Sequence, residues 1–167
     1  MLLTEFNAIA RDEAIALVKP ALDVPRWIDA IVDGRPYASV AAISDAALTA
    51  GSAFTEAEID GALAHHPRIG ESAKGATAEA AHSRREQAGV DASSAAALAA
   101  GNKEYEAKFD RVYLVRAAGR TADEILALLQ QRLGNTDEQE LVVIGQQLRE
   151  IAALRLAGAI ETEGASA

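Results

Sequence analysis

The chain has 167 residues, a length at which one compact domain buries roughly 70% of its unfolded surface. It contains no cysteine, which excludes disulfides, thiolate zinc sites and cysteine nucleophiles. Lys and Arg number 16 against 25 Asp and Glu, a formal net charge of −9. The basic residues form no cluster, so nucleic acid is not an expected partner.

The first third of the sequence predicts helices that face a core. Residues 4–18, "TEFNAIARDEAIALV", form a broad apolar stripe, and residues 24–32 continue it with Trp27, Ile28 and Ile31. "GRPY" at 34–37 interrupts the pattern, and residues 39–48 resume it. The N-terminus carries acidic residues early and no run of about 18 apolar residues occurs, so we expect a cytoplasmic protein without a membrane partner.

Three capping boxes predict the helix starts in the rest of the chain. Thr55 with Glu58 opens a helix through about Leu63, Thr121 with Glu124 opens residues 122–133, and Thr136 with Gln139 opens residues 137–160. The apolar residues of this last segment are Leu141, Ile144, Leu148, Ile151 and Leu154. The Ala-rich residues 92–100 fit another helix start.

The only strand-like run, residues 112–115, is too short to build a sheet. We therefore predict an all-α fold, a single compact domain of about eight helices over residues 1–161, followed by a disordered tail at 162–167.

All three histidines lie within residues 64–89. Pro67 biases His66 away from the helical region, so the preceding helix should end near His65 or His66, at the start of a loop over 67–76. A histidine there can meet a ligand and exchange a proton near neutral pH, although an exposed or capping role is the simpler interpretation. A three-histidine metal site with His82 stays open as an alternative, but the spacing does not favour it, and we predict no metal.

Two further positions could bind a polar molecule. On a predicted helix over 77–88, Ser83 lies one turn from Glu86 and Gln87, which can grip a molecule rich in N–H and C=O groups. A solvated face with Arg84 and Arg85 paired to nearby acids is the alternative. Arg155, flanked by Leu154 and Leu156, either meets a planar anion or carbonyl or extends to water, and from the residues alone we expect the latter.

Taken together, these motifs resemble the family of 2-oxo-4-hydroxy-4-carboxy-5-ureidoimidazoline decarboxylases, or OHCU decarboxylases, which complete the conversion of urate to (S)-allantoin. The resemblance covers most of the chain. It is carried in order by "PRWIDAIVDGRPYASV", "HHPRIG", "SRREQAG", "NKEYEAKF" and "RLGNTDEQE" leading into "IAALRL".

The resemblance implies an all-helical, dimeric enzyme that needs no cofactor, because the substrate's own ring accepts the electrons released with CO₂. It implies His66 as the catalytic acid/base with Glu86 as its partner. It also implies contacts with the small-molecule ureidoimidazoline substrate from Pro67, Ser83, Gln87, Arg155, Tyr113, Leu114, Val115, Arg116 and Ala117. A helical interaction module without turnover and a His/Glu metallohydrolase are the competing functions.

One segment departs from the family pattern. The sequence "KFDRVYLVRAAG" places Asp110 where the family has glycine and Arg111 where it has an aromatic residue. A main-chain contact that needs the positive φ of glycine would be lost by this change, whereas a contact independent of it would be kept.

Overall fold

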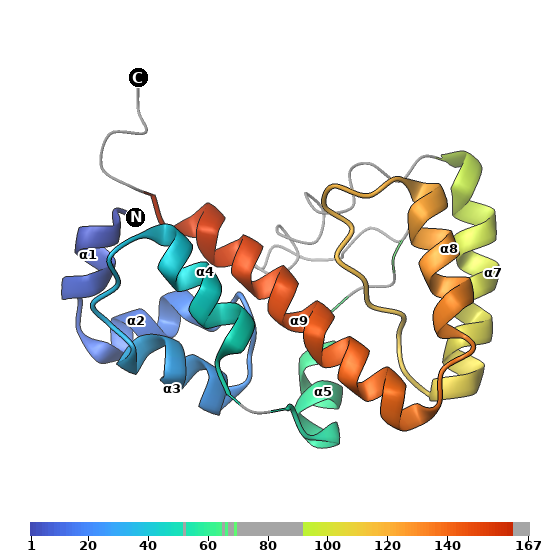
Figure 1. The fold of residues 1–167 in the computed structure, drawn as a ribbon, viewed down its shortest axis with the longest axis horizontal. Coiled ribbons are helices and arrows are strands. Elements are labelled where there is room, and N and C mark those ends of the chain that lie inside the picture. The colour runs from blue at the N-terminus through green and yellow to red at the C-terminus, as the bar shows by residue number, and fades with distance from the viewer. Residues whose placement is uncertain (52, 65, 67–68, 70–91, 162–167) are drawn as a thin grey trace. The chain divides into compact units, whose positions relative to one another are not determined.

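The computed structural model describes residues 1–51, 53–64, 66, 69 and 92–161, with the side chains of 92–95 left aside. These residues form eight helices and no sheet, with one isolated bridge between Leu2 and Glu161 (Figure 1). The predicted all-α class of about eight helices is confirmed. The helix expected over 77–88 and the tail expected at 162–167 lie outside the described residues.

The chain divides into two compact units, and the division does not follow a linker. Unit 1 comprises Met1–Phe54 with Leu148–Ala167, and unit 2 comprises Thr55–Gln147. Unit 1 holds α1 (Leu3–Ala8), α2 (Arg11–Val18), α3 (Pro25–Asp33) and α4 (Val40–Thr49). Unit 2 holds α5 (Glu56–Leu63), α7 (Ala92–Phe109) and α8 (Ala122–Arg132), and α9 (Asp137–Ala159) contributes residues to both units.

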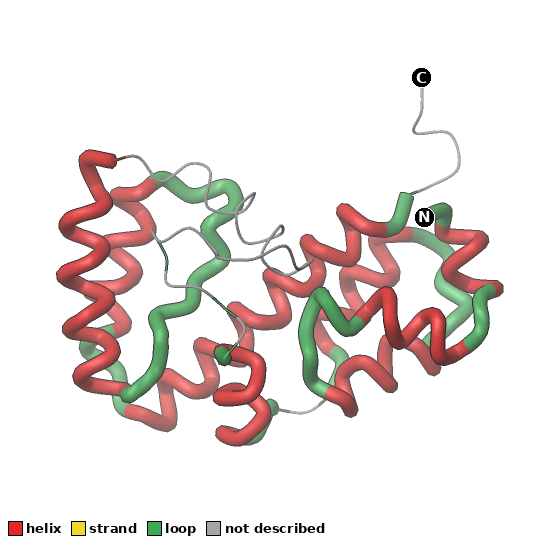
Figure 2. Tube along the Cα trace, turned by 180° about the vertical axis from the view of Figure 1, so that it is seen from behind, coloured by secondary structure: helices red, strands yellow, loops and turns green. Residues whose placement is uncertain are grey.

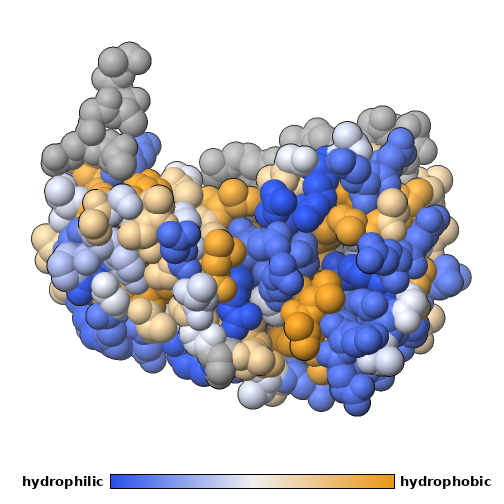
Figure 3. All heavy atoms as spheres, viewed as in Figure 1, coloured by the Kyte–Doolittle hydropathy of each residue, from blue (hydrophilic) through white to orange (hydrophobic). Residues whose placement is uncertain are grey.

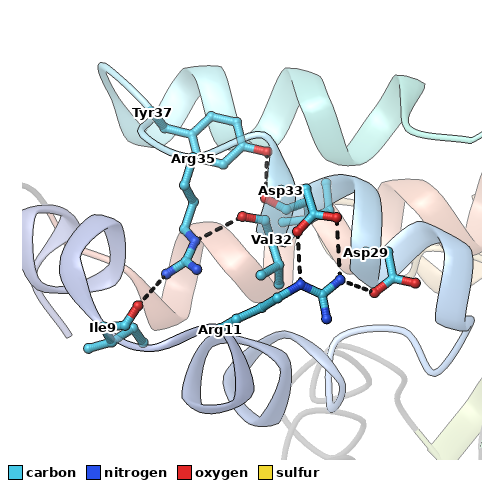
Figure 4. Close-up of polar contacts among 8 residues, drawn as sticks. Ile9, Arg11, Asp29, Val32, Asp33, Arg35 and Tyr37 are labelled. Carbon is cyan, nitrogen blue, oxygen red and sulfur yellow. Dashed lines mark hydrogen bonds and ion pairs between the residues drawn. The ribbon is translucent and has the colours of Figure 1, made fainter.

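The core of unit 1 forms where the apolar periodicity placed it. Trp27, Ile28 and Ile31 of α3 are buried, and the indole nitrogen of Trp27 donates a hydrogen bond of 3.0 Å to the carbonyl oxygen of Ala47 on α4. A buried indole N–H needs such a partner. Arg11 at the start of α2 forms ion pairs with Asp29 (2.6 Å) and Asp33 (3.0 Å) of α3 at the surface (Figure 4).

The apolar stripe over residues 4–18 is divided between two helices, which periodicity alone did not predict. The carbonyl oxygens of Phe6 and Ile9 accept hydrogen bonds from Nη1 of Arg35 at 2.8 and 2.9 Å, and Figure 4 shows the bond to Ile9. In a continuous helix these carbonyls would accept from the N–H groups four residues later. Arg35 replaces those donors, and Ile9 turns to an extended conformation (ψ 155°).

The predicted capping boxes are present in the structure. The Thr55 hydroxyl accepts from the Glu58 N–H while Glu58 accepts from the Thr55 N–H, and Thr121 with Glu124 repeats the arrangement at α8. Thr136 and Gln139 make the same reciprocal bonds before α9, at 3.3 and 2.9 Å. Each box satisfies N–H groups that a helix start leaves without an intrahelical partner.

The core of unit 2 forms between α7, α8 and the segment that connects them. Its cluster contains Ile69, Leu98, Tyr105, Phe109, Tyr113, Val115, Ala117, Ile125 and Leu129. Helices α7 and α8 run side by side (Figures 1 and 2). Gly101 allows their close approach, because a Cβ atom there would lie 2.7 Å from a methyl carbon of Leu129.

One face of unit 2 is mostly polar. On the face drawn in Figure 3, hydrophilic residues cover most of this unit, and hydrophobic residues appear in separate smaller areas, as expected for an acidic chain whose large apolar side chains pack inside. Among the described residues, no helix combines the length and hydrophobicity needed to cross a membrane.

Candidate functional site

The predicted site residues fall into three groups: those in unit 2, one in unit 1, and those that the structure does not describe. His66 and residues 113–117 belong to unit 2, and Arg155 belongs to unit 1. Pro67, Ser83, Glu86 and Gln87 lie outside the described residues, so their predicted roles stay predictions. The described part of the candidate site is therefore built from unit 2, with Arg155 considered by itself.

His66 lies immediately beyond the end of a helix, as the adjacent proline predicted. Helix α5 ends at Leu63, the end predicted from the capping box, and Ala64 still has helical dihedral angles. The His66 N–H donates a hydrogen bond of 2.9 Å to the Leu63 carbonyl oxygen, which closes a turn. This bond holds the main chain of His66 next to the end of α5. His66 is half-buried, so part of its surface stays accessible.

Ile69 anchors the chain three residues after His66. Its side chain is 5% exposed and belongs to the core cluster of unit 2. Its carbonyl oxygen accepts a hydrogen bond of 2.9 Å from the side-chain nitrogen of Asn102 on α7, itself 4% exposed. The Oδ1 atom of Asn102 is buried without a hydrogen-bond partner in the described structure. The main chain that follows His66 is thus held by a buried amide.

Residues 113–117 lie in the long connection between α7 and α8, which Figure 2 shows as loop. A loop of this length inside a compact unit is uncommon and is often functional. Tyr113, Val115 and Ala117 pack into the same cluster as Ile69, with the alternation of an extended chain. The structure therefore brings the segment after His66 and the predicted substrate-binding segment to one core.

Asp110, which stands where the family has glycine, does not change the backbone conformation, although we expected it to. Asp110 has φ of 52°, in the left-handed region that glycine favours, so the substitution keeps the positive φ that we expected it to remove. Aspartate adopts this conformation more readily than most residues. The expectation failed because it considered the intrinsic preference of the residue without the end of α7, where a left-handed residue is common.

Arg111 takes a role that an aromatic residue cannot have. Its guanidinium forms ion pairs with Glu56 and Asp60 of α5, the latter from Nε at 2.6 Å. Its side chain is 14% exposed, whereas those of the two acids are 63% and 49% exposed. The start of the loop is therefore attached to the helix that precedes His66.

Side chains hold the main chain of residues 113–117 at several points. The Leu114 carbonyl oxygen accepts a hydrogen bond of 2.6 Å from Nη1 of Arg132. The Arg116 N–H donates to the side-chain oxygen of Gln147 at 2.9 Å, and the Arg116 carbonyl oxygen accepts from Arg120. A loop fixed in this way presents its peptide groups in defined positions.

The bond to Leu114 comes from a buried ion pair. Arg132 and Glu140 are 5% and 1% exposed, and Nε and Nη2 of Arg132 lie 2.7 and 2.5 Å from Oε1 of Glu140. The Tyr105 hydroxyl donates to the same oxygen, and the side-chain nitrogen of Asn135 donates to Oε2 at 2.7 Å. Both carboxylate oxygens are therefore satisfied, as a buried charge requires.

The ionisation of these groups follows from burial and charge. Burial raises the pKa of the Tyr113 phenol to about 12, against the opposing charge of Arg132. Burial also raises the pKa of Tyr105 well above its usual range. For Arg132 burial opposes the charge, but the hydrogen bond to Glu140 and the negative charge of that carboxylate outweigh it, so its pKa is raised. The network contains neutral phenols around one buried cation and its carboxylate.

Sequence reasoning did not assign roles to Asn102, Arg132 or Glu140. The available signal was their position on apolar faces. Arg132 follows Ile125 and Leu129 at helical spacing, and Glu140 precedes Ile144 and Leu148 in the same way. A charged residue on the buried stripe of a helix predicts a buried partner, and two such residues in neighbouring helices could have been paired.

Arg155 is buried, which contradicts the expectation that it reaches water. It is 5% exposed, and its Nη1 donates a hydrogen bond of 3.3 Å to the Ala21 carbonyl oxygen within unit 1. Leu154, expected on the apolar face of this helix, is instead 44% exposed. Arg155 lies one turn beyond Ile151 and so shares its buried face, which periodicity would have shown. A desolvated guanidinium is the form that could recognise an anion or carbonyl.

Among the residues that the structure describes, no group of three His, Cys, Asp or Glu side chains could hold a metal ion. The alternative three-histidine site needs His65 and His82, which lie outside that part, so it stays untested.

Two of the comparisons with known proteins found matches, one for the sequence and one for the fold. The sequence matches the family model described as OHCU decarboxylase over residues 7–157, across both units. Two crystal structures are similar to the fold. One is (S)-allantoin synthase, with a TM-score of 0.65 and 16% identity over 96% of this chain, which spans about half of that protein (54%). The other is OHCU decarboxylase in the presence of (S)-allantoin, with a TM-score of 0.62 and 23% identity over 84% of this chain and 94% of that one.

No curated protein sequence matches. The family model covers most of the chain and confirms the resemblance drawn from the motifs. The chain therefore belongs to the OHCU decarboxylase family.

Proposed function

We propose that this protein catalyses the decarboxylation of 2-oxo-4-hydroxy-4-carboxy-5-ureidoimidazoline to (S)-allantoin and CO₂. The observation that carries the proposal is membership of the OHCU decarboxylase family over residues 7–157. The common core beneath Ile69 and residues 113–117 supports it, because the segment that follows the proposed acid/base and the proposed binding segment are held by the same packing.

The reaction can proceed on the substrate's own ring. When the bond to the carboxylate carbon breaks and CO₂ leaves, its electron pair forms a ring C=C bond and the π electrons of the neighbouring C=N move to the ring nitrogen. That nitrogen takes up a proton, which gives an enol-like intermediate. Protonation of the adjacent carbon from one face, with loss of the hydroxyl proton, completes allantoin. The protein must therefore transfer protons, stabilise developing negative charge and orient the ureido group.

We propose that His66 performs the proton transfer with Glu86 as its hydrogen-bond partner. An accessible, half-buried imidazole at the end of α5 suits this role, because it can reach a bound molecule while its main chain stays fixed. General acid/base catalysis of this kind accelerates a reaction by about 10² to 10⁴.

Arg155 is proposed to bind the carbonyl side of the substrate ring. Its burial supports this, because a desolvated guanidinium interacts strongly with developing charge on oxygen. A fixed cation on the departing carboxylate would stabilise the ground state instead, which slows loss of CO₂. Pro67, Ser83 and Gln87 and the main chain of residues 113–117 are proposed to hold the ureido arm.

The test is the rate of substrate loss with and without the protein, with substrate generated from urate by uricase and 5-hydroxyisourate hydrolase. The proposal predicts faster loss in proportion to protein concentration, unaffected by a chelator. A rate equal to the spontaneous one would favour the interaction module, and loss of activity with chelator would favour the metallohydrolase. The homodimer and the cytoplasmic location expected from the sequence stay predictions, the first to be tested by sedimentation.

A further inference from the structure

Burial of the ion pair of Arg132 and Glu140 is by itself weak evidence for a role in stability. Apolar residues of similar size would fill the same volume, and such replacements in protein interiors are often neutral or stabilising. Besides Glu140 and Tyr105, Arg132 contacts one main-chain group, the carbonyl oxygen of Leu114 at 2.6 Å.

The bonds of Arg132 to Glu140 fix the orientation of its guanidinium group. Nε and Nη2 are directed at Oε1 of Glu140, and this leaves Nη1 to donate to Leu114. Because the guanidinium is planar and its donors are fixed relative to one another, the position of Glu140 determines where Nη1 points. Glu140 is itself held by Tyr105 and Asn135, which come from α7 and from the turn before α9.

The aromatic rings around the guanidinium restrict it further. Its central carbon lies 4.7 Å from the ring centre of Tyr113 and 5.7 Å from that of Tyr105. Tyr113 also donates from its hydroxyl to the Ile125 carbonyl oxygen at 3.2 Å, so the ring beneath Arg132 is fixed to α8. The cation, its carboxylate and the ring are thus held together, and among the described residues the main-chain target of Arg132 is Leu114.

We propose that Arg132, oriented by Glu140, is a positioning residue that fixes the Leu114 carbonyl and thereby places the main chain of residues 113–117 for substrate binding. The inference rests on the proposed function, since it concerns the segment assigned there to the ureido arm. It also accounts for the motifs "NKEYEAKF" and "RLGNTDEQE", whose Tyr105, Arg132, Asn135 and Glu140 form this network.

The test compares Arg132→Lys with Arg35→Lys. Lysine keeps the positive charge but cannot direct separate fixed donors at Glu140 and Leu114. Arg35 is a matched control, because it also binds main-chain carbonyls, those of Phe6, Val32 and Ile9, the last two shown in Figure 4. It lies in unit 1 and has no assigned role in binding. Two experiments are made with each variant. Steady-state kinetics give kcat and KM for the ureidoimidazoline, and hydrogen exchange is followed in peptides containing residues 113–117.

The inference predicts that Arg132→Lys raises KM by about tenfold, as expected for losing one hydrogen bond from a charged donor, while kcat changes by less than about threefold. Exchange should accelerate at residues 113–117 beyond any change elsewhere in unit 2. Arg35→Lys should leave both quantities as in the wild type.

An unchanged KM in Arg132→Lys, or an equal rise in Arg35→Lys, would overturn the inference. Exchange that accelerates evenly throughout unit 2 would do so as well, because it would assign Arg132 a role in stability alone. A wild-type protein without turnover would refute the proposed function itself, and the exchange comparison would then still decide whether Arg132 holds this segment.

Discussion

Asn102 on α7 donates a hydrogen bond from its side-chain nitrogen to the carbonyl oxygen of Ile69, three residues beyond His66, at 2.9 Å. Both residues are buried, so water cannot replace the bond if it is lost. The relationship connects a helix in the core of unit 2 to the chain that carries the proposed acid/base. It gives the first residue of "NKEYEAKF" a physical role.

Replacing Asn102 with leucine should therefore destabilise the protein and slow turnover. The change keeps the branched shape and the number of side-chain heavy atoms but leaves the Ile69 carbonyl oxygen buried without its donor, at a cost of about 1 to 3 kcal/mol. Urea unfolding measures the stability, and the decarboxylation assay measures kcat. The control is Asn7→Leu, which removes the bonds between Asn7 and the main chain of Tyr37 in unit 1 and should leave kcat unchanged. Wild-type stability in Asn102→Leu would contradict the assignment.

Replacing Glu140 with glutamine should be strongly destabilising. It leaves Arg132 as a buried cation without its counter-charge, and breaking a buried pair in this way typically costs about 3 to 5 kcal/mol. The double variant Arg132→Met with Glu140→Leu should recover part of this stability while it loses the bond to Leu114. Denaturant unfolding of the single and double variants measures both effects.

The surface ion pairs of Arg11 offer the comparison. Arg11→Gln removes its bonds to Asp29 and Asp33, which are exposed, and should change stability far less than Glu140→Gln. Equal losses in the two variants would show that the Arg132–Glu140 pair is not desolvated as its burial indicates.

The three tyrosines predict an unusual response to alkaline pH. Burial raises the pKa of Tyr113 to about 12 and raises those of Tyr105 and Tyr37 as well. Because the folded-state pKa values exceed the ordinary value of about 10, the stability from these neutral phenols is fully present below pH 10. It is lost as pH rises through about 12.

Ultraviolet titration of phenolate formation tests this response. In the folded protein Tyr105 and Tyr113 should not ionise near pH 10, and their phenolates should appear together with unfolding at higher pH. In denaturant all three groups should titrate near their ordinary pKa. Ionisation of all three tyrosines near pH 10 while the protein stays folded would contradict the buried arrangement of Tyr105 and Tyr113.

Asp110 should tolerate glycine and resist β-branched residues. At its φ of 52° a side chain meets the following carbonyl oxygen, so Asp110→Val should destabilise the protein by about 1 to 2 kcal/mol, whereas Asp110→Gly should be close to neutral. Thermal unfolding followed by circular dichroism compares them. If valine were tolerated as well as glycine, the positive φ at this position would be in doubt.

The sequence predicted those features that depend on neighbouring residues. The capping boxes at Thr55, Thr121 and Thr136 are formed by side chains three residues apart, and the structure places them where the pattern did. The end of a helix near Pro67 followed equally from local sterics. The family followed from ordered motifs and is confirmed.

Features that depend on distant residues were not predicted. The division between α1 and α2 requires Arg35, and the position of the Leu114 carbonyl requires Arg132. Burial of Arg155 was missed because its immediate neighbours were considered without the face that it shares with Ile151. The assignments of His66 and Glu86 concern chemistry, which no pattern of packing or capping can establish.

The stereochemistry of the product tests the central claim most directly. The substrate also decays spontaneously, to racemic allantoin, so circular dichroism during urate breakdown by uricase and 5-hydroxyisourate hydrolase should be followed with the wild-type protein and with His66→Asn. We predict rapid growth of an (S)-allantoin signal with the wild type and its loss in a folded His66→Asn variant. A slow, optically silent course with the wild type would contradict the proposed decarboxylation, and an undiminished signal with the variant would remove His66 from the mechanism.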